Sequence, residues 1–175
     1  MPSKALSLFH RVENALETIA LASTPLETIH ATAEFLAANF ADDLGIKGGR
    51  IYRHTDGSYE LVKGFGEATD APIGLRVWKT YPPFEEMLDT GMVIMNRDDA
   101  RLDQHLEKEL GTRELFAAIA VSDGQYVLSF DVDTLDGDHE DLHRTLNIIR
   151  LAVNQKLREE RMVAIMEDEG AGEIG

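Results

Sequence analysis

ELFAAIAVSDGQYVLSFDVD, residues Glu114–Asp133, is the stretch that decides the fold. Two runs typical of β-strands flank Asp123-Gly124, the dipeptide of a tight type I′ hairpin turn. In the first run both faces are apolar, with Phe116, Ala118 and Ala120 on one side and Ala117, Ile119 and Val121 on the other. The second run places Val127, Ser129 and Asp131 on one face and Tyr126, Leu128, Phe130 and Val132 on the other. Because a strand with two apolar faces needs a cover on each, we expect a central hairpin in a sheet that is covered on both sides.

Helical patterns lie before and after this hairpin. The first predicted helix covers Ser3–Ser23, with a stripe formed by Ala5, Leu8, Phe9, Val12, Leu16 and Ile19. The second begins at Thr24-Pro25-Leu26-Glu27, a capping box with proline at the first helical position, and is expected to end near Leu44-Gly45. A long closing helix is predicted from about His139 to Met166, with a stripe formed by Leu142, Leu146, Ile149, Val153 and Leu157.

The middle of the chain predicts shorter elements. Arg50–Gly66 reads as a second hairpin around Asp56-Gly57. The irregular segment that follows, Glu67–Gly91, contains a possible short strand and a possible short helix, at Leu75–Lys79 and Phe84–Leu88. After it we expect a strand at Met92–Met95 and a helix that starts at Asp98 or Asp99 and ends at Leu110, before Gly111.

Composition sets limits on the class of protein. The 175 residues are 43% hydrophobic and 28% charged, as in one soluble domain, which we place at residues 1–166. Residues 167–175 form an acidic, glycine-rich tail, either a frayed end or a cut point in a longer protein. The absence of cysteine excludes disulfides and thiolate chemistry and favours a cytoplasmic location. The net charge of −15 disfavours nucleic-acid binding, and no apolar run is long enough to cross a membrane.

The order helix, helix, hairpin, irregular segment, strand, helix, hairpin, helix resembles a GAF domain, a small-molecule sensor and dimerisation module of signalling proteins. Four stretches carry the resemblance, namely Arg50–Gly66, Gly91–Asp98, Gly111–Ser122 and Asp138–Leu157. The resemblance implies an α+β fold: an antiparallel sheet of five or six strands, with the N- and C-terminal helices on one face and short helices and loops on the other. The family's frequent proline near Val121 and glycine near Tyr126 are absent.

The resemblance also implies a ligand pocket on the sheet face that the irregular middle segment covers. The candidate ligand-binding residues are Phe65, Arg76, Trp78, Lys79, Phe84, Met87, Ile94 and Phe116. Arginine suits an anionic group and tryptophan an apolar or cationic ring. The alternative is that the apolar members fill the core and that the cations are solvated. The Asn-Lys-Phe-Asp-Glu set of the cyclic-nucleotide-binding members is missing, as are the cysteines that attach bilins or reduce methionine sulfoxide. Haem needs an axial ligand, for which His54 or His105 stays open, but no cofactor is expected.

A literal H-E-x-x-H motif occurs at His139-Glu140-Asp141-Leu142-His143. In zinc proteases this spacing places two histidines on one helical face, with the glutamate activating water. Here the motif begins a helix, where acidic residues suit the helix dipole, and no third ligand is evident. We therefore expect no metal.

Three functions remain open at this stage. We expect a non-enzymatic sensory or regulatory domain that forms a parallel homodimer through its terminal helices. The alternatives are a ligand-free dimerisation scaffold and a metal-dependent hydrolase built on His139, Glu140 and His143. A PAS-like sensor is the nearest rival fold.

Overall fold

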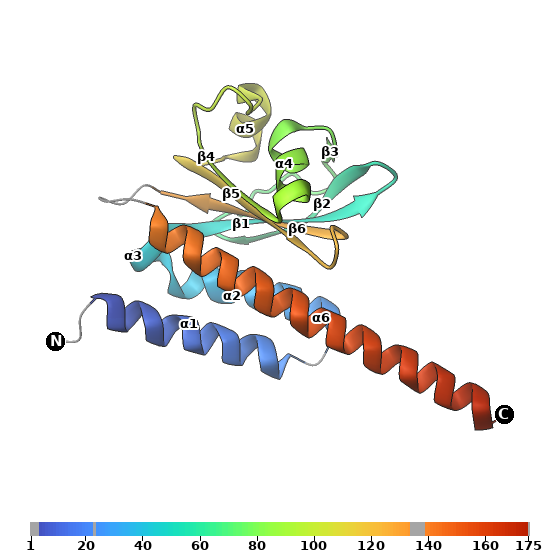
Figure 1. Cartoon of the computed structure of the whole chain (residues 1–175). Helices are drawn as coiled ribbons and strands as arrows, with labels where there is room; N and C mark the ends of the chain where they lie inside the picture. Colours follow the sequence, from blue (N-terminus) through green and yellow to red (C-terminus); the bar gives the residue numbers. More distant parts are fainter. Residues whose placement is uncertain (1–3, 23, 134–138, 175) are drawn as a thin grey trace.

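Six antiparallel strands form one sheet in the order β3-β2-β1-β6-β5-β4 (Figure 1). The structure is a computed structural model that describes residues 4–22, 24–133 and 139–174. The strands are β1 Ile46–Thr55, β2 Ser58–Gly66, β3 Arg76–Trp78, β4 Met92–Asn96, β5 Leu115–Val121 and β6 Tyr126–Val132. The helices are α1 Lys4–Leu21, α2 Pro25–Asn39, α3 Ala41–Leu44, α4 Pro82–Thr90, α5 Gln104–Leu110 and α6 Glu140–Ile174.

Helices cover both faces of the sheet, as the sequence predicts. Figure 1 shows α1, α2 and α6 on one side and α4 and α5 on the other. Helices α2 and α6 contact the strands, whereas α1 packs against these two helices and forms an outer layer on the same side. The fold is therefore the predicted α+β arrangement, with the first helix one layer further out than expected.

Both predicted turns form, but only the one at Asp56-Gly57 is a two-residue hairpin, since Ser122 also has a positive φ of 55° and the β5–β6 ladder ends at the Val121–Tyr126 pair. Asp123 and Gly124 have φ angles of 54° and 81°, and Gln125 N donates to Ser122 O at 3.1 Å. Asp56 and Gly57 have φ angles of 44° and 81°. Positive φ at both central residues defines a type I′ turn, whose twist matches that of the flanking strands.

Two hydrophobic cores lie on opposite faces of the sheet. The helical core contains the inner residues of α2 and α6 together with Ile51, Phe65, Ile119, Leu128 and Phe130. The distal core, under α4 and α5, contains Tyr52, Tyr59, Leu61, Val77, Phe84, Met87, Val93, Met95, Leu102, Leu110, Phe116, Ala118 and Val127. The face alternation that the sequence predicts for β5 and β6 is thus confirmed.

Helix α6 has a buried part and an exposed part. All five residues of the predicted stripe, from Leu142 to Leu157, are buried in the helical core. From Arg158 to Glu167 nearly every side chain is exposed. The helix continues to Ile174, beyond the end expected near Met166, and so includes residues 167–174 of the segment predicted as a tail. The boundary between domain and tail stays a prediction.

Two helix boundaries differ from the sequence-based expectation. The second predicted helix is divided at Phe40 into α2 and α3, and Gly45, with φ 74°, ends α3. Helix α5 starts at Gln104 because Asp103 accepts from the backbone N–H of His105 and Leu106, whereas the carboxylate of Asp99 binds Arg101. The predicted turn at Asp136-Gly137-Asp138 lies outside the described residues. Among the described helices, none combines the length and the apolar character needed to cross a membrane.

Candidate functional site

A buried ion pair lies on the distal face of the sheet. Arg50 of β1 is 1% exposed and binds Asp131 of β6 through two hydrogen bonds, Nη2–Oδ1 at 2.6 Å and Nη1–Oδ2 at 3.1 Å. Arg50 Nη1 also donates to the backbone oxygen of Leu110, at the end of α5, at 2.8 Å. Burial alone would lower the pKa of Arg50, but Tyr52 and Asp131 outweigh it and raise the pKa. The pair joins the centre of the sheet to the helix that covers it.

A second polar group lies beside this pair. Glu107 of α5 is fully buried and accepts hydrogen bonds from the hydroxyls of Tyr81 at 2.8 Å and Thr112 at 2.7 Å. Burial raises the pKa of Tyr52 to about 12, and burial together with Glu107 raises the pKa of Tyr81. The hydroxyl of Tyr81 also accepts from Asp103 N, so it ties the start of α4 to the start of α5.

Three buried polar side-chain atoms of this face have no hydrogen-bond partner among the described residues. They are Arg50 Nε, Ser129 Oγ and, beside Tyr59, His54 Nε2. Ser129 faces Arg50 across the β1–β6 ladder and lies two residues from Asp131 on the same face of β6. We call Arg50, Ser129 and Asp131 the polar cluster. Buried polar atoms are normally paired, so a polar molecule that reached this cluster would find a donor and a hydroxyl ready to bind it.

A hollow of about 200 Å³ opens above Asp131. Its walls are the β2–β3 loop and the carboxyl end of α5, through Glu67, Ala68, Asp70, Ala71, Glu109, Leu110, Gly111, Arg113 and Asp131. We call it the loop hollow. Arg113 spans its rim, since it binds Glu67 at 2.6 Å and Asp133 at 3.3 Å. This ion-paired strap holds the β2–β3 loop against the start of β5.

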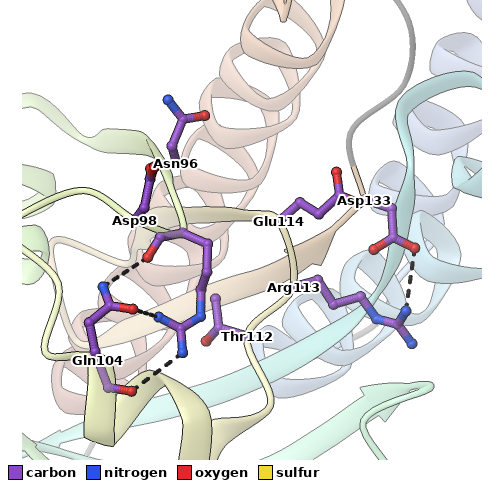
Figure 2. A pocket seen from close by; sticks show the side chains of 8 residues that line it. Asn96, Asp98, Gln104, Thr112, Arg113, Glu114 and Asp133 are labelled. Atoms are coloured by element: carbon purple, nitrogen blue, oxygen red, sulfur yellow. Dashed lines mark hydrogen bonds and ion pairs between the residues drawn. The ribbon is translucent and has the colours of Figure 1, made fainter.

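A wider, shallower hollow of about 690 Å³ lies on the other side of Arg113 (Figure 2). Figure 2 shows Arg113 joined to Asp133 at one side of the hollow. Gln104 Nε2 donates to the backbone oxygen of Arg97 at 2.9 Å, and Arg97 donates back to the Gln104 side chain. Both arginines at this hollow are thus engaged, Arg97 with Gln104 and Arg113 with Asp133.

The sequence matches no family model and no curated protein. Solved structures do match the fold. The nlh2 GAF domain of A. aeolicus, in an inactive state, superposes with a TM-score of 0.67 at 11% identity, covering 90% of this chain and 99% of that one. The chain has a GAF-like fold. A free methionine-R-sulfoxide reductase from Neisseria meningitidis, in complex with its substrate, superposes with a TM-score of 0.67 at 14% identity, covering 93% of this chain and 95% of that one. A phycoerythrobilin-bound GAF domain from a cyanobacterial phytochrome superposes with a TM-score of 0.56 at 16% identity, covering 89% of this chain and 99% of that one.

The GAF-like fold separates the eight predicted ligand residues into three groups. Phe84, Met87 and Phe116 lie together in the distal core, where each is at most 2% exposed, and Phe116 is the ladder partner of Asp131. Phe65 and Ile94 face the helical core, so their predicted place on the distal face is wrong. Phe65 in fact packs edge-on against Phe130, with the ring centroids 5.9 Å apart.

The remaining three predicted residues lie at the edge of the sheet. Arg76, Trp78 and Lys79 are exposed on and just after β3, and Trp78 is 68% exposed. They do not lie beside Phe84, because only Val77 of this three-residue strand points into the distal core. Whether any of the eight residues contacts a ligand stays a prediction.

The H-E-x-x-H motif lies at the start of α6, in its first turn. Glu140 binds Arg144 of the next turn, and His143 is exposed. In residues 4–22, 24–133 and 139–174 no three metal-ligating side chains converge. His54 stacks edge-on with Tyr59, with the ring centroids 5.5 Å apart, and His105 is exposed.

Sequence reasoning missed the polar cluster as a site. The signal was present, because a strand pattern that placed Ser129 and Asp131 on a covered face implied buried polar groups in need of partners. Arg50 could not be matched to Asp131 from the sequence, since their pairing depends on β1 and β6 being neighbours in the sheet.

Proposed function

We propose that this chain is a non-enzymatic sensory or regulatory domain that binds a small molecule through the loop hollow and the polar cluster beneath it. One observation carries the proposal. A buried arginine and a buried serine hold unpartnered polar atoms next to Asp131, which forms part of the wall of a hollow. Such an arrangement on the sheet face opposite the long helices suits a ligand-responsive domain. The phycoerythrobilin-bound neighbour supports the idea that this fold can hold a small molecule. The chain's lack of cysteine suits a reducing compartment such as the cytoplasm.

The chemistry of the loop hollow favours a small ligand with a positive group. Glu67, Asp70, Glu109 and Asp131 contribute four carboxyl groups to the wall, while Arg113 already binds Glu67 and Asp133. A volume of about 200 Å³ is below the usual range for drug-sized ligands and suits a single amino acid or a small amine. An ammonium group would meet the carboxylates, and an attached polar group could reach Ser129 Oγ or Arg50 Nε.

A ligand in this position could influence α6 through the sheet. Strand β6 carries Ser129 and Asp131 on its distal face and Leu128 and Phe130 on its helical face. Leu128 and Phe130 belong to the same buried cluster as the inner stripe of α6. A small shift of β6 on binding would therefore act on the helix whose last part extends beyond the domain.

A thermal-shift screen with the twenty L-amino acids and a set of small amines tests this proposal. We expect at least one compound to raise the melting temperature of the wild-type protein and to have a much smaller effect on Ser129→Ala. Ser129→Ala removes an unpartnered hydroxyl, so the stability of the unliganded protein should hold within about 1 kcal/mol. Glu34→Gln, an exposed change on α2, is the matched control. A screen without any stabilising compound, or equal shifts in both proteins, would contradict the proposal.

We further propose that the chain forms a homodimer through the outer side of its helical layer. Large apolar side chains are exposed there, namely Phe9 and Leu21 of α1, Leu26 of α2, and Ile148, Leu151, Met162, Val163, Ile165 and Met166 of α6. Exposed apolar groups of this number commonly mark an interface. The stripe from Leu142 to Leu157 cannot form the dimer interface, because it is buried against the sheet.

Sedimentation of matched variants separates these two surfaces. Ile148→Glu with Leu151→Glu should yield a folded monomer, since both side chains are about half exposed. Ile149→Glu should instead unfold the domain, because Ile149 is fully buried. A wild-type monomer at tens of micromolar would contradict the dimer.

A ligand-free dimerisation scaffold is the second candidate. It is favoured by the dense packing of the distal core, where the rings of Tyr52, Tyr59 and Phe84 form edge-on pairs with centroids 5.4 and 5.5 Å apart. The scaffold predicts an unaltered melting temperature in the screen together with a stable dimer.

A further inference from the structure

Another hollow, of about 280 Å³, lies at the sheet end where the β5–β6 turn meets α4 and α6. It is lined by Leu88, Gly91, Ala120, Asp123, Gly124, Arg150, Asn154 and Arg158. Since α4 and α6 cover opposite faces of the sheet (Figure 1), a hollow lined by both lies at a sheet edge. Gly91, the residue directly before edge strand β4, marks that edge. We call this hollow the edge hollow. It is separate from the loop hollow, because the two hollows share no lining residue.

Helix α6 presents two arginines to the edge hollow. Arg150, Asn154 and Arg158 are spaced by four residues and so lie one above another on the same side of the helix. Asn154 fixes the helix to the turn, since its Oδ1 accepts from Ser122 N at 2.8 Å and its Nδ2 donates to Ala120 O at 3.2 Å. The two arginines therefore lie about one helical turn before and one turn after an anchored residue.

Neither arginine has a carboxylate partner among the described residues. Arg150 bonds to the amide oxygen of Asn147, at 3.2 and 2.8 Å, and Arg158 forms no hydrogen bond or ion pair there. Most other arginines of this part of the chain do bind a carboxylate, as Arg11, Arg50, Arg53, Arg101, Arg113, Arg144 and Arg161 show. In a chain with 32 acidic and 17 basic residues, two guanidinium groups without a carboxylate partner at one hollow are unexpected.

The local charge at the edge hollow is positive although the chain is acidic. Asp123 is the one carboxylate of the described lining, and Arg161 already binds it at 3.1 Å. Arg150 Nη1 lies near Gly91, the C-cap of α4, so the carbonyl end of that helix partly balances Arg150. Arg158 lies near no such helix end among the described residues and has no hydrogen-bond partner there, so its charge is the less compensated of the two.

We propose that the edge hollow binds the phosphate group of a small anion, held between Arg150 and Arg158. Phosphate offers several acceptor oxygens, which suits two guanidinium groups better than a single carboxylate does. The bound group would bridge α6 to the end of α4 and to the β5–β6 turn. It would act on α6 from outside the sheet and independently of a ligand in the loop hollow.

Amide NMR titration with inorganic phosphate at constant ionic strength tests the site. We expect saturable shifts at Gly91 and at the turn residues Ser122–Gln125, with a dissociation constant on the order of 1 mM for so small and open a site. Arg158→Gln should raise that constant about tenfold, because one charge-assisted contact is lost. Arg150→Gln should act in the same direction. Arg158 is exposed and unbonded, so its loss should leave the fold intact.

Two controls make the result specific. Arg144→Gln changes an exposed arginine that lies before Arg150 on α6 and outside the edge hollow, and this variant should bind phosphate as the wild type does. Ser129→Ala should also bind it normally, so a failure of the loop hollow and a failure of the edge hollow remain distinguishable. Shifts that grow linearly without saturation, or that Arg158→Gln leaves unchanged, would overturn the proposal.

Parallel titrations with glucose 6-phosphate and acetate identify the source of the anion. Tighter binding of glucose 6-phosphate than of phosphate assigns a phosphorylated metabolite, and the reverse order assigns the free ion, both in support of the site. Acetate should bind more weakly than either. Equal binding of acetate and phosphate would contradict the choice of a phosphate group.

Discussion

Arg50 and Asp131 form a buried ion pair on the distal face of the sheet. Removing one partner leaves the other charge buried without compensation, so Arg50→Met should lower the free energy of unfolding by about 3–5 kcal/mol. Adding Asp131→Leu to Arg50→Met should restore much of that loss, because two apolar side chains replace a desolvated pair. Urea unfolding of the wild type, both single variants and the double variant measures this coupling. Additive losses in the double variant would show that the pair is not coupled.

The buried tyrosines make stability depend on alkaline pH. Burial raises the pKa of Tyr52 from 10.0 to about 12. Below pH 10 Tyr52 is protonated in both the folded and the unfolded state, so its contribution to stability is complete there. Between pH 10 and 12 the unfolded state loses this proton first, and stability should fall by about 1.4 kcal/mol per pH unit. Tyr52→Phe should reduce the slope by that amount, as measured by urea unfolding across this range. The substitution also removes a hydroxyl that interacts with Arg50, which changes the free energy of unfolding at every pH. The slope of stability against pH is therefore the readout for the Tyr52 proton. An unchanged slope would show that Tyr52 does not retain its proton.

For single residues, the sequence predicted the face of the sheet on which a side chain lies, because that face follows from alternation along the residue's own strand. Alternation assigned Ser129 and Asp131 correctly to the covered face opposite Phe130. Phe65 and Ile94, which the resemblance placed in the pocket, instead face the helical core. Partners from other strands, such as Arg50 for Asp131, depend on sheet order and could not be read from local pattern.

The elements divide by the kind of signal that defines them. The capped start of α2 was predicted well, since Thr24 accepts from Glu27 N at 3.1 Å, but the cap of α5 is Asp103 and not the predicted Asp98 or Asp99. Helix ends were predicted unevenly too, because α5 ends at Leu110 as expected whereas α6 continues to Ile174. Gly170 and Gly172 do not stop α6, although each glycine costs a helix interior about 1 kcal/mol.

The exposed part of α6 should contribute little to the stability of the domain. Side chains from Arg161 to Glu167 are exposed, so deleting residues 162–175 should change the free energy of unfolding at low concentration by less than about 1 kcal/mol. The same deletion should weaken the proposed dimer, since it removes Met162, Val163, Ile165 and Met166. Denaturant unfolding together with sedimentation checks both outcomes. A large loss of stability in a monomeric sample would mean that this part packs on the domain.

The molecule as a whole has one sheet between two unlike layers. The helical side is continuous and apolar, whereas the distal side is made of short elements held by ion pairs and hydrogen bonds, such as the Arg113 strap to Glu67. The sequence predicted this division, because long amphipathic helices and an irregular middle segment differ plainly in pattern. It did not predict that the distal face would be filled by Phe84, Met87 and Phe116, since apolar residues that line a cavity and those that fill one look alike in a sequence.

The central claim is that a ligand acts on the distal face at the polar cluster. Hydrogen exchange measured by mass spectrometry, with and without the strongest stabilising compound of the amine screen, tests it most directly. We predict slower exchange in the β2–β3 loop at residues 67–71 and at the end of α5 near Leu110, with both effects reduced in Ser129→Ala. Protection confined to α1 and α6, or protection that is equally strong in Ser129→Ala, would contradict the account.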